Sequence, residues 1–262
     1  MTKNILIIGG GGILGTAFAE ELKKRKKYNI ISPSRKECNI SKINDLKKHI
    51  NNDINLVINC AGLINVDEVE RDPNEALHVH ILGVYYLNKI CKEKNIDLML
   101  FGSTVDNEIT NVYALTKKIS LQIPDLVEHK KTYRYRLGWL FGNPDKKNNF
   151  VEFVINNLKE NNKLGLTDNY LGSPAYVKDV AKYCIDNFEK ENYETKDLAN
   201  KGTVSKYTLA KKIAKILNIK DKFYINNNFK EVAKRCKDSS VKGGLRPYEK
   251  ALKEYLYEKC NF

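Results

Sequence analysis

The first half of the chain alternates short apolar runs with longer amphipathic stretches. Apolar residues recur at helical spacing near 13–26, 41–51, 73–94 and 112–128. Between these stretches, β-branched runs predict strands at NILIIG (4–9), NIISP (29–33), NLVINCAG (55–62), DLMLFGS (97–103) and TYRYRLGWLFG (132–142). Pro124 should end or kink the fourth helix. This alternation implies right-handed βαβ crossovers, and so predicts an α/β fold with a doubly wound parallel sheet covered on both faces.

The pattern changes after Gly142. A polar stretch and a loop-rich segment separate helices that the apolar spacing predicts near 149–161, 176–190, 205–217 and 248–259. We therefore predict a first domain over residues 1–142 and a smaller lobe over 143–262. The segment 176–200 holds a helix and the short strand-like KDLAN, so it could also return to the first sheet.

Composition and charge narrow the possible functions. With 262 residues, 42% of them hydrophobic, the chain can bury a core in one large domain or two lobes. The net charge is +13, and the Lys residues are spread over nearly every predicted helix. This distribution favours solvated charged surfaces and a small anionic ligand over a nucleic-acid partner. The apolar run at 5–8 is too short for a membrane or a signal peptide. Six cysteines without a Cys-x-x-Cys pair predict reduced thiols in a cytoplasmic protein, and no metal site.

A glycine-rich turn follows the first predicted strand. IIGGGGILGTAF places Gly9, Gly12 and Gly15 directly before a predicted helix, where a pyrophosphate can approach the backbone N–H groups. After the second strand, SPSRKE has cationic and hydroxyl side chains where an acid would bind the ribose 2′-hydroxyl of NAD. These residues are Ser34, Arg35 and Lys36. Cations suit a 2′-phosphate, so the sequence predicts an NADP(H) site, with NADH as an alternative.

A Tyr and a Lys four residues apart form the most specific candidate for chemistry. Tyr113 and Lys117 would share one face of the fourth helix. A Lys ammonium about 5 Å away contributes roughly 3 kcal/mol, or about two pKa units, which would make Tyr a usable acid or base. Thr104 or Ser103, at the end of the fourth strand, could polarise a substrate carbonyl. The alternative is that Tyr113 packs and Lys117 is solvated.

The ordered set GGGGILG, NCAG, ST, YALTK and YRLGWLFG resembles an extended short-chain dehydrogenase/reductase of the Rossmann type. The segments VINCAGLINVDEVERDPNEALHVHILGVYYL, NNFVEFVINNL, DNYLGSPAYVKDVA and GLRPYEKAL more closely resemble the dTDP-4-dehydrorhamnose reductases and related nucleotide-sugar 4-ketoreductases. The similarity runs through almost the whole chain. It implies an oxidoreductase for the synthesis of surface polysaccharide sugars.

The resemblance also implies roles for individual residues. NADPH would reduce a sugar C4 ketone, Tyr113 would protonate the forming alkoxide, Lys117 would hold the nicotinamide ribose, and Thr104 would polarise the carbonyl. Further cofactor contacts would come from Gly9, Gly12, Ile13, Leu14, Gly15, Asn39, Cys60, Ala61 and Gly62. The nucleotide-diphosphate sugar would contact Ser103, Trp139, Asn149, Phe150, Ser173, Pro174 and Arg246.

The sequence departs from this family between Thr104 and Tyr113, where STVDNEITNVY is shorter than the family's loop and borders the expected sugar. The nucleotide and hexose therefore stay open, since dTDP, GDP, CDP or UDP sugars fit equally well. An epimerase or dehydratase on the same scaffold, and a non-catalytic NADP-binding regulatory protein, are alternative functions. The pattern Tyr85-Tyr86-Leu87 predicts helix packing or a homodimer face, and His78 and His80 make a poor metal pair.

Overall fold

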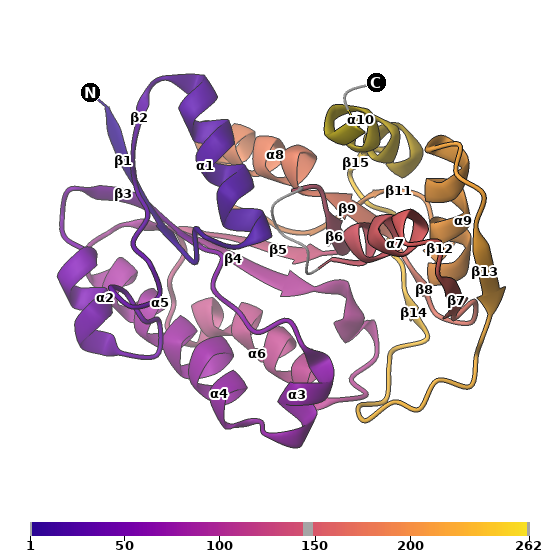
Figure 1. The fold of residues 1–262 in the computed structure, drawn as a ribbon. Coiled ribbons are helices and arrows are strands. Elements are labelled where there is room, and N and C mark those ends of the chain that lie inside the picture. The colour runs from indigo at the N-terminus through magenta and orange to yellow at the C-terminus, as the bar shows by residue number, and fades with distance from the viewer. Residues whose placement is uncertain (1, 144–148, 261–262) are drawn as a thin grey trace.

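The computed structural model describes residues 2–143 and 149–260. The largest sheet among these residues has six parallel strands in the order β10-β5-β4-β3-β1-β2 (Figure 1). They are β1 (Lys3–Ile8), β2 (Tyr28–Ile31), β3 (Ile54–Asn59), β4 (Asp97–Ser103), β5 (Thr132–Leu137) and β10 (Thr195–Leu198). The order reverses between β1 and β3, and ligands of open α/β sheets bind beyond such a switch point. The predicted doubly wound parallel sheet is confirmed.

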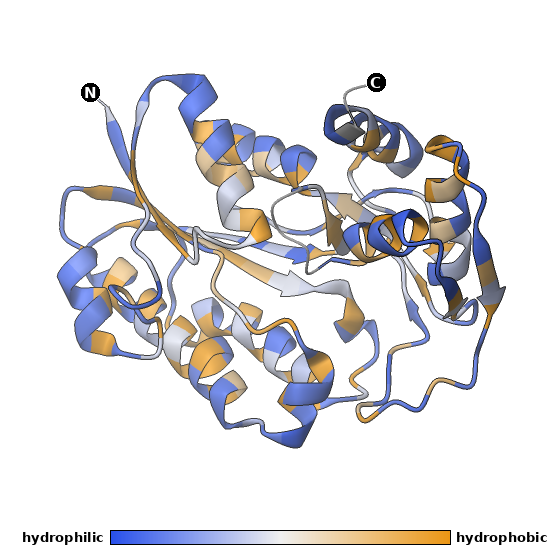
Figure 2. Cartoon of the chain, in the orientation of Figure 1, coloured by the Kyte–Doolittle hydropathy of each residue, from blue (hydrophilic) through white to orange (hydrophobic). Residues whose placement is uncertain are grey.

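Helices cover both faces of this sheet (Figure 1). One face carries α1 (Ile13–Arg25) and α8 (Val177–Glu189). The other carries α2 (Ile43–His49), α3 (Val66–Arg71), α4 (Asn74–Ala76), α5 (Gly83–Glu93) and α6 (Val112–Leu126). Side chains alternate along a strand, so Ile5 and Ile7 join the core under α1 and α8, while Leu6 joins the core under α5 and α6. Figure 2 shows orange, apolar stretches along part of the sheet between these layers.

Two predicted elements are divided in the structure. The helix expected over 73–94 is α4, then a π-helical turn over Leu77–Leu82, then α5. The strand expected over 132–142 is β5 and then β6 (Trp139–Phe141), which leaves the main sheet to pair with β9 (Pro174–Tyr176). Gly138 lies at this divide, where a Cβ would come within 2.2 Å of the Ser173 carbonyl oxygen. Pro124 lies in the last turn of α6, which ends two residues later.

The smaller lobe packs around its own apolar core. Its helices are α7 (Phe150–Lys159), α9 (Lys206–Ile216) and α10 (Tyr248–Cys260). Its strands, besides β6 and β9, are β7 (Lys163–Leu166), β8 (Leu171–Gly172), β11 (Asn200–Lys201), β12 (Val204–Ser205), β13 (Lys222–Ile225), β14 (Asp238–Ser239) and β15 (Leu245–Pro247). Val154, Ile213 and Leu252, one from each helix, are fully buried in this core.

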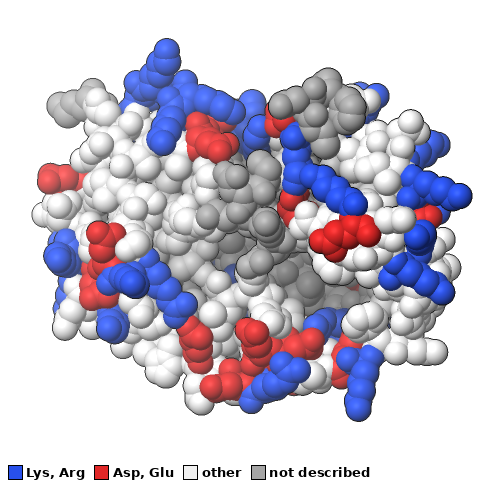
Figure 3. Space-filling model, in the orientation of Figure 1, with Lys and Arg blue, Asp and Glu red and all other residues white. Residues whose placement is uncertain are grey.

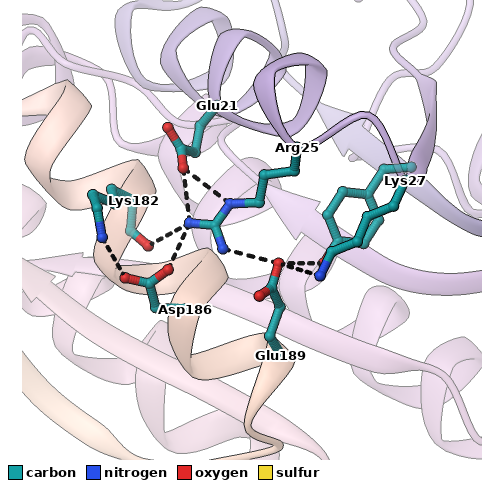
Figure 4. A network of polar contacts seen from close by, with 7 residues as sticks. Glu21, Arg25, Lys27, Lys182, Asp186 and Glu189 are labelled. Atoms are coloured by element: carbon teal, nitrogen blue, oxygen red, sulfur yellow. Dashed lines mark hydrogen bonds and ion pairs between the residues drawn. The ribbon is translucent and has the colours of Figure 1, made fainter.

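The segment that contains α8 and β10 lies with the first sheet. β10 extends that sheet beside β5, and α8 packs against α1. Arg25 on α1 bonds Glu21 on its own helix and reaches Asp186 and Glu189 on α8, at 2.6 and 2.8 Å (Figure 4). A division of the chain at residue 142 would therefore separate α8 and β10 from the first sheet. Segment 176–200 returns to that sheet, which is the alternative that the sequence left open.

Charged side chains are spread over the surface. Figure 3 shows Lys and Arg distributed among Asp and Glu over the visible face, without one continuous basic patch there. Within the described residues, no helix is both long and apolar enough to cross a membrane.

Candidate functional site

A cavity of about 1010 Å³ lies at the carboxyl ends of β1, β3 and β4, between the main sheet and the smaller lobe. The first lobe contributes the glycine turn, the segment after β3 and the start of α6 to its lining. The smaller lobe contributes Trp139, Phe150 and Lys206. Because β1 and β3 flank the switch point of the sheet, the cavity lies where a ligand is expected.

The glycine turn leaves open space at the N-terminus of α1. Gly9 has a φ of +77°, and a Cβ there would come within 2.7 Å of the Ala61 backbone nitrogen. A Cβ on Gly11 would meet nothing within 4 Å, and Gly11 and Gly12 both line the cavity. The first turn of α1 has no acidic residue and its N-cap, Gly12, makes no side-chain cap. Exposed backbone N–H groups without a competing carboxylate suit a pyrophosphate.

Tyr113 and Lys117 both line the cavity, together with Ser103. Asn111 starts α6 because its side chain accepts a hydrogen bond from the Ala114 N–H at 2.8 Å. Burial raises the pKa of Tyr113 to about 12, while a hydrogen bond with Ser103 acts in the opposite direction. Burial also lowers the pKa of Lys117 to about 8, and its amine donates to the Phe101 carbonyl at 2.6 Å. The expectation that Lys117 brings the pKa of Tyr113 down is thus wrong, because desolvation by burial raises that pKa instead.

The family assignment follows from comparison with known proteins. The model of the RmlD substrate binding domain family matches residues 2–256. The chain belongs to this family. Over its whole length it is 25% identical to the spore coat polysaccharide biosynthesis protein SpsK of Bacillus subtilis strain 168, of which it covers 99%. It is 27% identical to a dTDP-4-dehydrorhamnose reductase of Aggregatibacter actinomycetemcomitans, over 71% of this chain and 67% of that protein.

Solved structures show the same relationship. A dTDP-4-dehydrorhamnose reductase from Bacillus anthracis in complex with NADP superposes with a TM-score of 0.92, at 23% identity over 98% of this chain and all of that one. A dTDP-4-dehydrorhamnose reductase from Clostridium acetobutylicum gives a TM-score of 0.91, at 25% identity over 99% of this chain and all of that one. The predicted resemblance to these reductases, and the assignment as a short-chain dehydrogenase/reductase-type oxidoreductase, are confirmed.

Thr104 does not line the cavity of this RmlD-family chain. Its side chain is fully buried at the start of a 3-10 turn over Thr104–Asn107, and its hydroxyl has no hydrogen-bond partner among the described residues. Ser103 is the hydroxyl that reaches both the cavity and Tyr113. The geometry therefore corrects the preference for Thr104 over Ser103.

The predicted cofactor residues divide into two groups. Gly12, Ile13, Leu14, Cys60, Ala61 and Gly62 line the cavity. Gly9 and Gly15 shape the turn, since a Cβ on Gly15 would come within 2.5 Å of Gly10. Ser34, Arg35, Lys36 and Asn39 lie beyond the cavity after β2. Arg35 pairs with Glu75, and the Asn39 side chain accepts from the Ser41 N–H at 3.0 Å, so this region is organised by local contacts.

The predicted substrate residues also divide. Ser103, Trp139, Asn149 and Phe150 line the cavity. The hydroxyl of Ser173, a fully buried residue, donates to the Val241 carbonyl, and Pro174 is buried in β9. Arg246 bonds Asp179 and Glu254, at 2.9 and 2.5 Å. None of these last three lines the cavity. The Ser173 hydroxyl and the Arg246 guanidinium are engaged by the partners just named, and Pro174 is enclosed in β9, so their assignment to the substrate is corrected.

Sequence reasoning missed Lys206, the first residue of α9. Its amine lies 3.7 Å from the ring centroid of Trp139 and 4.3 Å from that of Phe150, and burial lowers its pKa to about 7. Among the described residues, no carboxylate forms an ion pair with it. A Lys at a helix N-terminus opposes the helix dipole, and this unfavourable placement is the sequence signal that could have identified it.

The short loop before Tyr113 is held by Arg136 on β5. The guanidinium bonds Asp106 at 2.7 Å and Asp197 at 2.6 Å, and also the Asn107 side chain. Asn107 in turn donates to the carbonyls of Asp238 and Ser240 in the smaller lobe. Ion pairs and hydrogen bonds thus fix the loop, although it is shorter than the family's.

Proposed function

We propose that this chain reduces the 4-keto group of a nucleotide-diphosphate-linked sugar with NADPH, as a step in the synthesis of surface polysaccharide sugars. The observation that carries the proposal is the meeting of Ser103, Tyr113 and Lys117 at the wall of the cavity beyond the glycine turn. The names of its relatives support the reaction class: two are dTDP-4-dehydrorhamnose reductases, and one is a spore coat polysaccharide protein.

The cofactor fits the glycine-turn end of the cavity. Gly11 and Gly12 leave room at the N-terminus of α1 for a pyrophosphate, and Cys60, Ala61 and Gly62 line the adjoining wall. At the edge of the sheet, the Arg35 side chain is 72% exposed and can exchange its contact with Glu75 for a ribose 2′-phosphate. NADPH, when bound there, supplies a hydride.

Tyr113 acts as the proton donor in this proposal. With a pKa of about 12 it stays protonated near neutrality, the state that a reduction requires. As the ketone carbon accepts the hydride, the electrons of the C=O bond move to oxygen and the phenolic proton of Tyr113 follows. Ser103 donates a hydrogen bond to the carbonyl oxygen, and the Lys117 ammonium stabilises the phenolate that remains.

The sugar nucleotide occupies the far end of the cavity. Trp139 and Phe150 offer apolar ring faces, and the Lys206 amine, which lies over both rings, carries a positive charge below its pKa of about 7. The N-termini of α7 and α9 also lie here, since Phe150 and Lys206 begin these helices. A diphosphate suits this combination of charge and helix ends.

The experiment that tests the proposal measures cofactor stoichiometry. The purified chain is incubated with NADPH and a panel of dTDP-, GDP-, CDP- and UDP-linked 4-keto sugars. We expect one NADPH oxidised for each 4-hydroxy sugar formed with one member of the panel. Interconversion of sugars without net NADPH oxidation would instead indicate an epimerase, and NADP(H) binding with no conversion of any member would favour a regulatory protein.

A further inference from the structure

His80 links the two parts of the protein that must meet for the reaction. Its Nε2 accepts a hydrogen bond from the backbone N–H of Leu63, in the segment after β3 that lines the cavity, at 3.0 Å. Its Nδ1 lies 3.0 Å from the Thr116 hydroxyl on α6. Thr116 in turn donates to the backbone carbonyl of Tyr113, also at 3.0 Å. One side chain therefore connects the cofactor wall with the catalytic tyrosine.

The partners of His80 determine which ring nitrogen carries the proton. A backbone N–H can only donate, so Nε2 has to be unprotonated. The proton is then on Nδ1, which donates a hydrogen bond to the Thr116 hydroxyl, and this hydroxyl donates its own hydrogen bond to the Tyr113 carbonyl. His80 is 2% exposed, and burial lowers its pKa to about 3, so the ring stays neutral. Each hydrogen bond in the series Leu63–His80–Thr116–Tyr113 therefore has one fixed donor and one fixed acceptor.

Local geometry places the ring beside the reacting groups. His80 lies in the π-helical turn over Leu77–Leu82, a form that is frequent at functional sites. Its ring meets that of Tyr113 edge-on, with centroids 5.7 Å apart and planes at 84°. A Cβ added to Gly62 would lie 3.5 Å from His80 Nε2 and 3.8 Å from Lys117 Nζ, so His80 and Lys117 flank the same glycine of the cavity wall.

We propose that His80 is a positioning residue that fixes Tyr113 and the cavity wall at residues 61–63 relative to each other. The inference rests on the proposed function for its kinetic consequence, because the distance from Tyr113 to the ketone depends on where that wall holds the cofactor. A misplacement of about 1 Å can reduce a rate about 100-fold.

Two substitutions separate the two bonds of His80. In His80→Gln the amide oxygen can replace Nε2 and accept from Leu63, but the bond to Thr116 is lost. In His80→Asn the amide nitrogen can replace Nδ1 and donate to Thr116, but the bond to Leu63 is lost. We expect each variant to lower kcat roughly 10- to 100-fold, with KM for the sugar changed less than about twofold.

Double variants then test which hydrogen bond of His80 each substitution breaks. Thr116→Val breaks the same hydrogen bond as His80→Gln, so the double variant with both substitutions should lose no more activity than either single variant. Thr116→Val and His80→Asn break different hydrogen bonds, so their losses of activity should add in the double variant. His129→Gln is the matched control, because His129 is also buried and bonds Asn88 and the Ile96 carbonyl away from the cavity. If the His80 variants lose as much stability as His129→Gln and keep the wild-type kcat, the proposal is overturned.

Two further measurements do not need a known sugar. The chain has only four histidines, so ring-nitrogen NMR can assign His80 by the signal missing in His80→Gln. We expect a neutral ring protonated on Nδ1 between pH 5 and 8; protonation on Nε2, or an imidazolium, would overturn the proposal. NADP(H) titrations should show weaker binding in His80→Asn than in His80→Gln. If no sugar is reduced, the proposed function fails, while these two results still decide the role of His80.

Discussion

At the scale of single residues, burial dominates the properties of the site. It raises the pKa of Tyr113 to about 12 and lowers that of Lys117 to about 8. The tyrosine therefore stays protonated across the neutral range, and the lysine is the group that changes charge near pH 8. The sequence predicted the Tyr-Lys pair from its spacing, but spacing alone carries no information on desolvation.

This difference predicts the pH dependence of reduction. Lys117 is charged below its pKa, so kcat/KM should be level up to about pH 7 and should fall as the pH rises through 8, tenfold per unit. Lys117→Arg keeps its charge to higher pH, so any activity it retains should lack this decline. A wild-type profile that stays level to pH 10 would contradict the role given to Lys117.

Lys206 should contribute mainly to binding of the sugar nucleotide. Lys206→Met keeps the length of the side chain and removes the charge between Trp139 and Phe150. We expect KM for the nucleotide sugar to rise about tenfold, the equivalent of about 1.4 kcal/mol, with kcat within about threefold. Lys215→Met, an exposed position on the same helix, is the control and should change neither constant. An unchanged KM in Lys206→Met would exclude this lysine from the substrate site.

The residue-level predictions failed where a backbone turn or a partner distant in the sequence decides what a side chain contacts. Ser103 and Thr104 are adjacent in the sequence, and only the backbone turn after β4 decides which hydroxyl reaches the cavity. Arg246 matched a family segment, yet Asp179, 67 residues away, binds its guanidinium. Such long-range pairings carry no local signal, so sequence could not resolve them.

At the scale of elements, the Arg136 contacts explain how a shortened loop stays ordered beside the cavity. Asp106 is 4% exposed, and this burial raises the pKa of its carboxyl. The ion pair with Arg136 acts in the opposite direction and compensates the burial of the charge. We expect Arg136→Met to destabilise the protein by about 3 kcal/mol, because it leaves a buried carboxylate unpaired. Urea unfolding monitored by circular dichroism measures this.

A second substitution separates the lost ion pair from a general packing defect. Asp106→Asn in the Arg136→Met background removes the unpaired charge and should recover more than half of the lost stability. Losses that simply add in the double variant would show that the two side chains act independently.

The predicted elements were most accurate where one period of apolar residues continued without interruption. The strands of the main sheet and helices α1 and α6 lie close to their predicted ranges. The stretch 73–94 kept a helical period throughout, so its π-helical turn, which widens the helix by one residue around His80, was missed. The strand at 132–142 also has a continuous apolar pattern, although the close approach of Ser173 divides it at Gly138.

At the scale of the whole molecule, a segment of the smaller lobe closes one side of the cavity. The Ala233 N–H and the Arg235 guanidinium both bond Asp67 on α3, at 3.0 and 2.9 Å. The Lys234 carbonyl accepts from Asn111 at 2.7 Å. The alternating pattern predicted the main sheet, but these cross-lobe contacts involve polar loops, whose partners sequence periodicity cannot identify.

Loosening this closure should affect substrate binding more than stability. Asp67→Leu removes both bonds to the smaller lobe, and we expect KM for the nucleotide sugar to rise about fivefold, while the free energy of unfolding falls by less than about 1 kcal/mol because the pair is partly exposed. Asp125→Leu, which removes the exposed pair with Arg134 outside the cavity, should leave KM unchanged. Equal KM values for both variants would argue against a role for the closure.

The most direct test of the proposed reduction follows the hydrogen itself. NADPH carrying deuterium at its transferable position is incubated with the nucleotide-linked 4-keto sugar that supports NADPH oxidation, and the product is examined by NMR. We predict one deuterium at C4 of the sugar for each NADPH oxidised by the wild type, and a rate lower by at least about 100-fold in Tyr113→Phe with NADP(H) binding retained. A product without deuterium at C4, or full activity in Tyr113→Phe, would contradict the function proposed for this protein.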